Sequence, residues 1–86
     1  MKTVYKYPFA TEMSVPLRAK LLKVAYQEGE LFAWFLVDPK EELIKTKYME
    51  IYGTGQPFSN GSAEFYVNTV FDPNGFVWHI FEYYHE

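Results

Sequence analysis

The sequence contains no cysteine, and this absence removes two means of stabilising a small protein. Neither a disulfide nor a thiolate metal site can form without cysteine, and the absence also fits a reducing cytosol. A chain of 86 residues buries only roughly 60–65% of the surface that its unfolded form exposes. Its stability must therefore come from a dense core or from association with other chains.

Positive charge is also scarce. Eight Lys and Arg stand against eleven Asp and Glu, for a net charge of −3, and Arg18 is the only arginine. Binding to a phosphate backbone needs clustered Lys and Arg, so we expect no nucleic-acid binding. No apolar run approaches the roughly 20 residues of a membrane helix, and the N-terminus has no continuous apolar segment typical of a signal peptide. We expect one soluble, intracellular domain over residues 1–86, without membrane contact.

Aromatic residues are abundant, at 21% of the chain, with eight Phe, eight Tyr and two Trp. They favour a dense aromatic core. Tyr buries its ring while its hydroxyl needs a polar partner, so Tyr is enriched at half-wet surfaces and at interfaces. This composition is also consistent with a homo-oligomer.

The alternation of apolar residues predicts β-strands and no long helix. The strongest prediction is a hairpin from Glu64 to Tyr84, closed by the turn Asp72-Pro73-Asn74-Gly75. Its second strand is apolar on both faces, so a core should pack on one side and a core, a partner subunit or a ligand on the other. Residues 30–38 are also apolar on both faces and should form a central strand. Further strands are predicted at residues 3–7, 14–15, 19–27 and 44–53. Short connections predict an all-β fold, an antiparallel meander of five to seven strands forming a small sandwich or barrel.

The segment Gly53-Thr54-Gly55-Gln56-Pro57 is the sharpest local motif. Closely spaced glycines allow backbone N–H groups to converge on an anion, and Thr54 and Gln56 add side-chain donors. No helix or phosphate-loop lysine follows, which excludes the Walker and dinucleotide-binding patterns. Two interpretations stay open: a ligand-binding loop, or a strand end that turns and needs glycine, which is the more common case.

His79, Glu82, His85 and Glu86 have the composition of a metal site, but strand geometry argues against one. Positions separated by an odd number point to opposite faces, so Glu82 faces away from both His79 and His85. A zinc site would need a bulge or a second chain. We expect a half-buried His79 bonded to a Tyr or a backbone group, with a catalytic or ligating role as the alternative.

No set of nucleophile, base and acid is visible, so we expect neither an enzyme nor a cofactor. Tyr48 with Tyr52, and Tyr66 with Asn68, are expected on the partly polar faces of neighbouring strands. Such a surface can stack a nucleobase, at about 1–3 kcal/mol per base. It can equally form an interface between subunits, which is the more common outcome.

Five segments together resemble a family of small, uncharacterised bacteriophage proteins. They are Tyr5-Lys6-Tyr7-Pro8, residues 15–22, residues 34–38, the Gly53–Pro57 loop and the closing residues 76–82, Phe-Val-Trp-His-Ile-Phe-Glu. The family pattern has a GTG-x-P loop and a VWH-[IL]-FE strand, and this chain has Gln56 where His is expected. The resemblance implies a phage origin and an accessory role in the host cytoplasm, and it implies no reaction.

We therefore predict a non-enzymatic, anti-defence type of phage protein that sequesters a small nucleotide-derived signalling ligand as a homo-oligomer. The loop amides would hold phosphates, Tyr or Trp would stack a base, and Arg18 would make a bidentate phosphate contact. The expected ligand-binding residues are Arg18, Tyr48, Tyr52, Gly53, Thr54, Gly55, Gln56, Trp78 and His79. The alternative is a module that inhibits a host protein through its exposed aromatics, with Glu82, His85 and Glu86 facing a basic partner. A hydrolase that uses His79 is a third interpretation.

Overall fold

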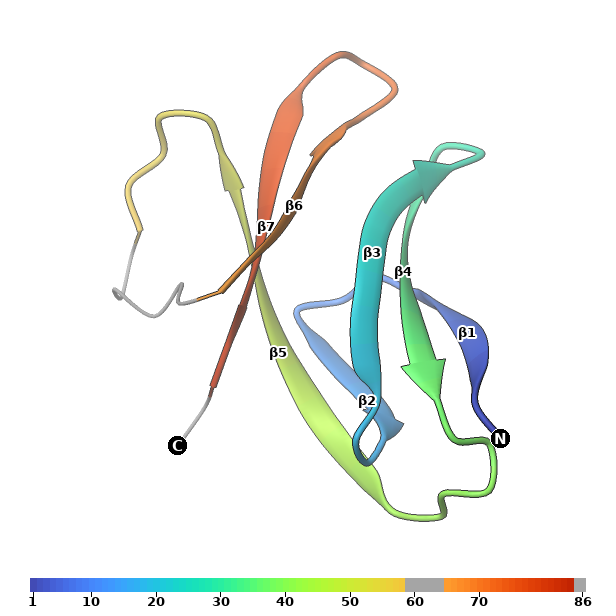
Figure 1. Cartoon of the computed structure of the whole chain (residues 1–86). Helices are drawn as coiled ribbons and strands as arrows, with labels where there is room; N and C mark the ends of the chain where they lie inside the picture. The colour runs from blue at the N-terminus through green and yellow to red at the C-terminus, as the bar shows by residue number, and fades with distance from the viewer. Residues whose placement is uncertain (59–64, 85–86) are drawn as a thin grey trace.

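The computed structural model describes residues 1–58 and 65–84, and these form seven β-strands and no helix (Figure 1). The strands are β1 (Thr3–Pro8), β2 (Glu12–Pro16), β3 (Lys20–Gln27), β4 (Glu30–Val37), β5 (Ile44–Gly53), β6 (Phe65–Phe71) and β7 (Val77–Tyr83). All of the pairings between them are antiparallel. The all-β prediction is confirmed, and within the described ranges no helix is long and apolar enough to cross a membrane.

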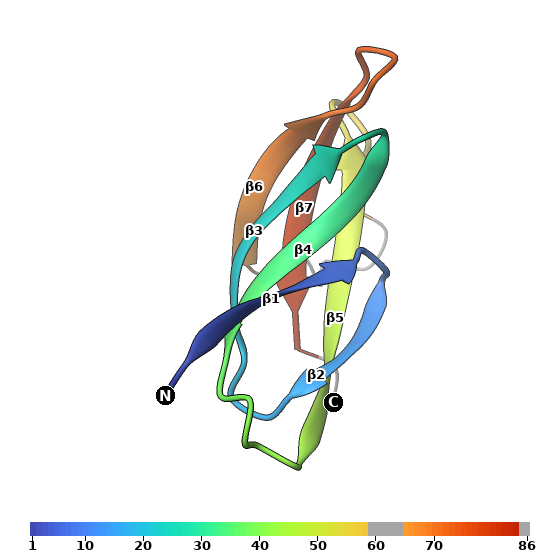
Figure 2. The ribbon, with the colours of Figure 1, turned by 90° about the vertical axis from the view of Figure 1, so that its right-hand side faces the viewer.

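The strands form two sheets, with the orders β1-β4-β3 and β2-β5-β7-β6. The three-stranded sheet lies in front of the four-stranded sheet in Figure 2, so the architecture is a small sandwich. β4 has a neighbouring strand on each side, which confirms its predicted central place. β5 and β7 are the central strands of the other sheet. Successive strands pair only as the hairpins β3–β4 and β6–β7. The chain passes to the other sheet after β1, β2 and β4, and β7 lies between β5 and β6, so the strands do not form the expected meander.

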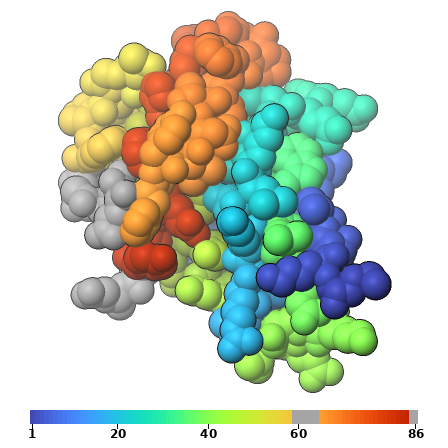
Figure 3. All heavy atoms as spheres, in the orientation of Figure 1, coloured from blue at the N-terminus to red at the C-terminus, as the bar shows by residue number. Residues whose placement is uncertain are grey.

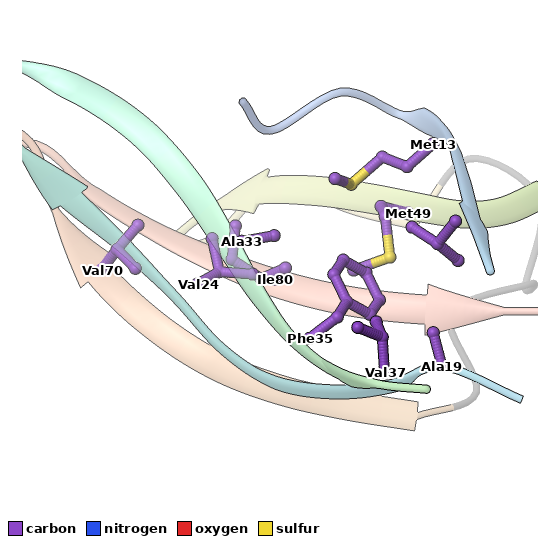
Figure 4. Close-up of a cluster of buried hydrophobic side chains, with 10 residues drawn as sticks. Met13, Ala19, Val24, Ala33, Phe35, Val37, Met49, Val70 and Ile80 are labelled. Atoms are coloured by element: carbon purple, nitrogen blue, oxygen red, sulfur yellow. The ribbon is translucent and has the colours of Figure 1, made fainter. Parts of the chain in front are cut away.

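The core lies between the sheets and is mostly aliphatic. Phe35 of β4 and Met49 of β5 point toward each other from opposite sheets (Figure 4), and both are almost fully buried. The largest fully buried side chains are Phe35, Met49, Ile80, Val15, Val24 and Val37. The expected dense aromatic core is therefore only partly realised. Tyr7, Phe9, Tyr26 and Trp78 pack only partly buried against this cluster, and other rings lie on the outer faces of the sheets.

Two irregularities change which residues face the core. The register shifts between Leu21 and Lys23 in β3, and between Tyr66 and Asn68 in β6. An extra residue in a strand reverses the alternation that follows it. Tyr66 consequently faces outward while Asn68 faces the other sheet, so the prediction that these two side chains share a face is wrong.

Asn68 joins the edges of the two sheets. Its Oδ1 accepts a hydrogen bond from the Val24 N–H at 3.0 Å, and its Nδ2 donates to the Val24 carbonyl at 2.7 Å. The side-chain amide thus takes the place of a neighbouring strand for an edge residue of β3. β6, in orange, lies against β3, in cyan, in Figure 3, which shows the sandwich closed along this side.

The predicted turn of the last hairpin is confirmed. The Gly75 N–H donates to the Asp72 carbonyl at 3.0 Å, and Gly75 has a φ of 85°, a left-handed conformation that glycine adopts without strain. Asp72 Oδ1 accepts from the N–H groups of Asn74 and Phe76, and Oδ2 accepts from the Trp78 indole at 3.0 Å. The hydrogen bond from Trp78 is the main reason why the pKa of the Asp72 carboxyl is lowered; the turn amides add to the effect.

Candidate functional site

The outer face of the four-stranded sheet carries a group of neighbouring aromatic rings, which we call the aromatic face. Its rings belong to Tyr48, Tyr52, Phe58, Tyr66, Phe81 and Tyr83. The strand register explains this, because it places Tyr48 opposite Tyr83 and Phe81 opposite Tyr66 on one side of the sheet. The aromatic face is thus built from three strands, β5, β6 and β7, and from the residues that follow β5.

The rings of the aromatic face contact one another. Phe58 lies 4.5 Å from Tyr52 and 5.1 Å from Phe81, between ring centroids, and Tyr66 lies 5.7 Å from Phe81. Tyr52 is buried beneath this layer, whereas Phe58 is 48% exposed and Tyr66 is 59% exposed. Phe71 lies on the same side of β6 and is also largely exposed. A supported layer of rings is therefore open to solvent.

His79 lies at one end of the aromatic face, between two hydroxyl groups. Its Nε2 is 2.7 Å from Thr54 Oγ1, and its Nδ1 is 2.9 Å from Thr69 Oγ1. The Tyr66 hydroxyl is in turn 2.7 Å from Thr69 Oγ1. His79 is half-buried as expected, but its direct partners are threonines, and the tyrosine is reached through one of them. Both ring nitrogens of His79 thus have a threonine hydroxyl as hydrogen-bond partner, and these contacts hold the ring in place.

The aromatic face carries no lysine or arginine among the described residues of β5, β6 and β7 that point outward. Glu50 lies on it and accepts a hydrogen bond from the Tyr52 hydroxyl. Lys45 and Lys47 point to the opposite side of β5, as the alternation predicts. The face is therefore aromatic and neutral to acidic, which is a poor environment for phosphate groups.

Lys47 and Glu82 form an ion pair on the inner side of the four-stranded sheet. Lys47 Nζ is 3.0 Å from Glu82 Oε2, and the two side chains are only 17% and 20% exposed. The contact between Lys47 Nζ and Glu82 Oε2 lacks hydrogen-bond geometry. Within the described part of the chain, Glu82 Oε2 therefore has no hydrogen-bond donor. Glu82 thus does not belong to the aromatic face, contrary to its expected place on an interaction surface. His85 and Glu86 lie outside the described residues.

The Gly53–Gln56 segment forms a turn that is closed by its own groups. The Gln56 N–H donates to the Gly53 carbonyl at 3.1 Å, and the Gly53 N–H donates to the Gln56 side-chain oxygen at 3.0 Å. Gly55 has a φ of 85°, so this position does favour glycine. The Gly53 amide is therefore already satisfied within the turn, which favours the strand-end interpretation of the motif.

The structure brings together some of the predicted ligand-binding residues and separates others. Tyr52, Thr54 and His79 lie together, with Tyr48 four positions before Tyr52 along β5. Trp78 faces the opposite side of β7 from His79. Arg18 lies in the turn before β3, beside the start of β5. Ten residues of β5 separate that end from Gly53, a distance of about 30 Å at 3.3 Å per residue. Arg18 and the Gly53–Pro57 loop therefore do not form one site.

A shallow hollow of about 310 Å³ lies at the loop end of the sheet, lined by Gly53, Thr54, Gly75, Phe76, Val77 and Trp78. The sequence interpretation did not include Phe58, Thr69 and Phe81 in a site. A signal for one of them was present: counting outward from the Asp72–Gly75 turn pairs Thr69 with His79. Phe58 had no such signal, because it follows β5 in a segment without strand pairing.

No group of three or more His, Asp or Glu side chains with metal-binding geometry occurs in residues 1–58 and 65–84. Comparisons with known proteins add a family but no activity. No curated protein matches the chain, and no solved structure matches it. The model of a domain of unknown function, DUF7352, matches residues 1–86. Because this match spans the full sequence, the chain belongs to the DUF7352 family.

Proposed function

We propose that the protein is a non-enzymatic binding module that engages a partner protein through the aromatic face. The observation that carries this proposal is the layer of contacting rings with Phe58 and Tyr66 about half exposed. Contiguous exposed apolar patches mark interaction sites, and aromatic side chains dominate the binding energy at such sites. An accessory role in a phage-infected bacterium, which the sequence resemblance implies, is compatible with inhibition of a host protein.

The chemistry of the face defines the partner. With Glu50 on the face and Glu12 opposite Tyr48 at its margin, it suits an apolar or basic protein surface. A basic side chain of the partner can also lie over an exposed ring, a contact worth about 0.5–1 kcal/mol at an exposed site. The hydroxyl links from Thr54 through His79 and Thr69 to Tyr66 hold the polar end of the face in place before binding. A prearranged surface loses less entropy on association.

Sequestration of a nucleotide-derived ligand is the second candidate, and the hollow beside the Gly53–Gln56 turn favours it. Its volume of about 310 Å³ is near the lower end of the range for small-molecule sites, about 300–1,000 Å³. Its lining contains no Lys or Arg, so it would hold a base or a nucleoside and leave phosphates in solvent. A thermal-shift panel of cyclic dinucleotides, ADP-ribose derivatives and nucleosides tests this. A ligand at a hundred times its Kd adds about 2.7 kcal/mol, which raises the melting temperature of a domain of this size by about 11–22 °C.

The partner-protein proposal is tested by site-specific photo-crosslinking in bacterial lysate. A benzophenone amino acid replaces Tyr66 on the aromatic face in one sample and Leu43 in another. Leu43 is a matched control because it is 64% exposed and lies in the β4–β5 connection, away from the face. We expect position 66 to yield one dominant adduct, which mass spectrometry identifies, and position 43 to yield none.

The identified partner is then purified and titrated by calorimetry. We expect Tyr66→Ala to weaken binding at least tenfold and Leu43→Ala to change it less than twofold. Adducts of equal yield at both positions, or equal affinities of the two variants, would contradict the proposal. An adduct of the chain with itself alone would instead assign the aromatic face to a homo-oligomer interface.

A further inference from the structure

The outer face of the three-stranded sheet differs in charge from the aromatic face. The register places Lys6 of β1 and Lys23 of β3 on either side of Trp34, and Lys20 on one side of Leu36. Three of the eight basic residues of an acidic protein are thus gathered on one side of one sheet. We call this surface the basic face; it looks toward the viewer in Figure 2.

The lysines of the basic face surround apolar side chains. Phe32 and Trp34 are half-buried neighbours on β4, with ring centroids 6.2 Å apart. Lys6 Nζ lies 4.5 Å from the centroid of the Phe32 ring and donates a hydrogen bond to Gln27 Oε1 at 2.9 Å. The Lys6 ammonium is therefore held over the sheet rather than extended into solvent. Glu30, next to the β3–β4 turn, is the one acidic residue among the outward-facing residues of β4 that the structure describes.

A hollow of about 360 Å³ opens on this face, lined by Val4, Leu22, Lys23, Ala25 and Trp34. Its existence depends on the irregularity in β3, which places Leu22 outside the regular pairing and leaves it 45% exposed. Val4 of β1, on the other side of β4 from Leu22, is 49% exposed. Four apolar walls with a lysine at the margin match a large apolar side chain that is flanked by negative charge.

We propose that the basic face is a second docking surface, which binds an acidic segment of a protein. One large apolar side chain of that segment occupies the hollow, and its neighbouring carboxylates pair with Lys6, Lys20 and Lys23. Charge selects between the two faces. The lysines attract the acidic segment to the basic face, whereas Glu50 and Glu12 repel its carboxylates from the aromatic face. The surface lies on the opposite side of the sandwich from the aromatic face, so the chain can join two partners.

The same lysines can attract single-stranded nucleic acid, but the hollow argues for protein. Single strands are held mainly by stacking of several bases on successive aromatic rings, and Trp34 is the one ring that lines this hollow. Its other apolar walls, Val4, Leu22 and Ala25, suit an aliphatic or aromatic side chain. The net charge of −3 also opposes a polyanion more than it opposes a short peptide. The occupant is therefore a protein segment in this proposal, and nucleic acid is an outcome of its test.

The test uses synthetic probes and amide chemical shifts from the full, ¹⁵N-labelled chain. The probes are a 12-residue peptide with six Glu around one central Phe, the same peptide with Ser for Phe, the same peptide with Gln for Glu, and a dT12 oligonucleotide. We expect the Glu/Phe peptide to shift amides of β1, β3 and β4, and each altered peptide to bind at least fivefold more weakly. Raising the salt should weaken the binding further.

Matched charge reversals connect the binding to the face. Lys23→Glu and Lys20→Glu should each lower the affinity for the Glu/Phe peptide at least tenfold. Lys40→Glu makes the same change of charge at an exposed position between β4 and β5, and should change the affinity less than twofold. The proposal fails if the shifts fall elsewhere, if the three reversals act alike, if dT12 binds more tightly than the peptide, or if the chain itself dimerises through this face. Photo-crosslinking from position 66 is repeated in the Lys23→Glu variant. It tests the aromatic face alone, so failure of the basic-face proposal is distinguished from failure of the aromatic-face proposal.

Discussion

Replacing Asn68 by alanine tests whether a single side chain holds the two sheets together at their shared edge. The Asn68 amide makes two hydrogen bonds to the backbone of Val24, at 3.0 and 2.7 Å, and Val24 is completely buried. Val24 lies in an edge strand, so its N–H and carbonyl point away from β4 and toward Asn68. The substitution removes both partners without touching the hydrophobic contacts of Val24 itself.

The expected cost follows from those two bonds. Each hydrogen bond contributes about 0.5–1.5 kcal/mol net, and a buried group left without a partner costs about 1–3 kcal/mol. We therefore expect Asn68→Ala to lower the free energy of unfolding by about 2–4 kcal/mol. A domain of this length has only about 4–13 kcal/mol in total. At 4–8 °C per kcal/mol the melting temperature should fall by roughly 10–30 °C.

Urea unfolding followed by tryptophan fluorescence measures the free energy, and hydrogen exchange measures protection of the Val24 amide. Asn74→Ala is the matched control, because Asn74 is exposed in the hairpin turn and its hydrogen bond to Asp72 uses the backbone N–H. It should change stability by less than about 0.5 kcal/mol. If Asn68→Ala loses no more stability than this control, and its Val24 amide is still protected from exchange, then Asn68 does not join the two sheets as we argue.

Three further predictions concern the turns and the ion pair. The pKa of the Asp72 carboxyl is lowered in the folded protein, so the ionised carboxylate stabilises the fold. This stabilisation is complete above the ordinary pKa of about 3.9 and is lost as the pH falls through the lowered pKa. Asp72→Asn should therefore reduce the loss of stability at acid pH, measured by urea unfolding from about pH 2 to 7. Gly75→Ala, at a φ of 85°, should cost about 1–2 kcal/mol, whereas Gly53→Ala should be nearly neutral in thermal unfolding, because its φ is not left-handed and a Cβ there meets the Trp78 ring at 3.6 Å, an ordinary contact. Lys47→Met should cost about 2 kcal/mol or more by leaving Glu82 unpaired, and the double variant Lys47→Met/Glu82→Leu should recover most of that loss; a double variant as unstable as the single one would contradict this.

Much of the fold could be predicted because its signals are local. Alternation along residues 44–53 correctly predicts that Tyr48 and Tyr52 share one side of β5 and that Met49 lies on the other. The Asp72–Gly75 turn determines the register of the last hairpin, and with it the pairing of Thr69 with His79. These features depend on neighbouring residues and on a period of two, which the chain shows directly.

The candidate site was harder to predict, because its parts come from distant segments. The shift between Tyr66 and Asn68 left no signal in the alternation, yet it separates two side chains that a regular strand would keep together. Arg18 and the Gly53–Pro57 loop both resemble anion-binding groups, but opposite ends of β5 hold them apart. Phe58 joins the aromatic face through ring contacts, without strand pairing.

The sequence by itself determined the all-β class, the last hairpin and which residues of β5 share a side, because backbone geometry and turn chemistry act over a few residues. Only the tertiary structure decided that the rings form one outer face, that lysines gather around Trp34 on the other, and that Asn68 joins the two sheets. Those outcomes depend on which strands become neighbours and where a strand gains an extra residue. Both are set by packing between segments far apart in the chain.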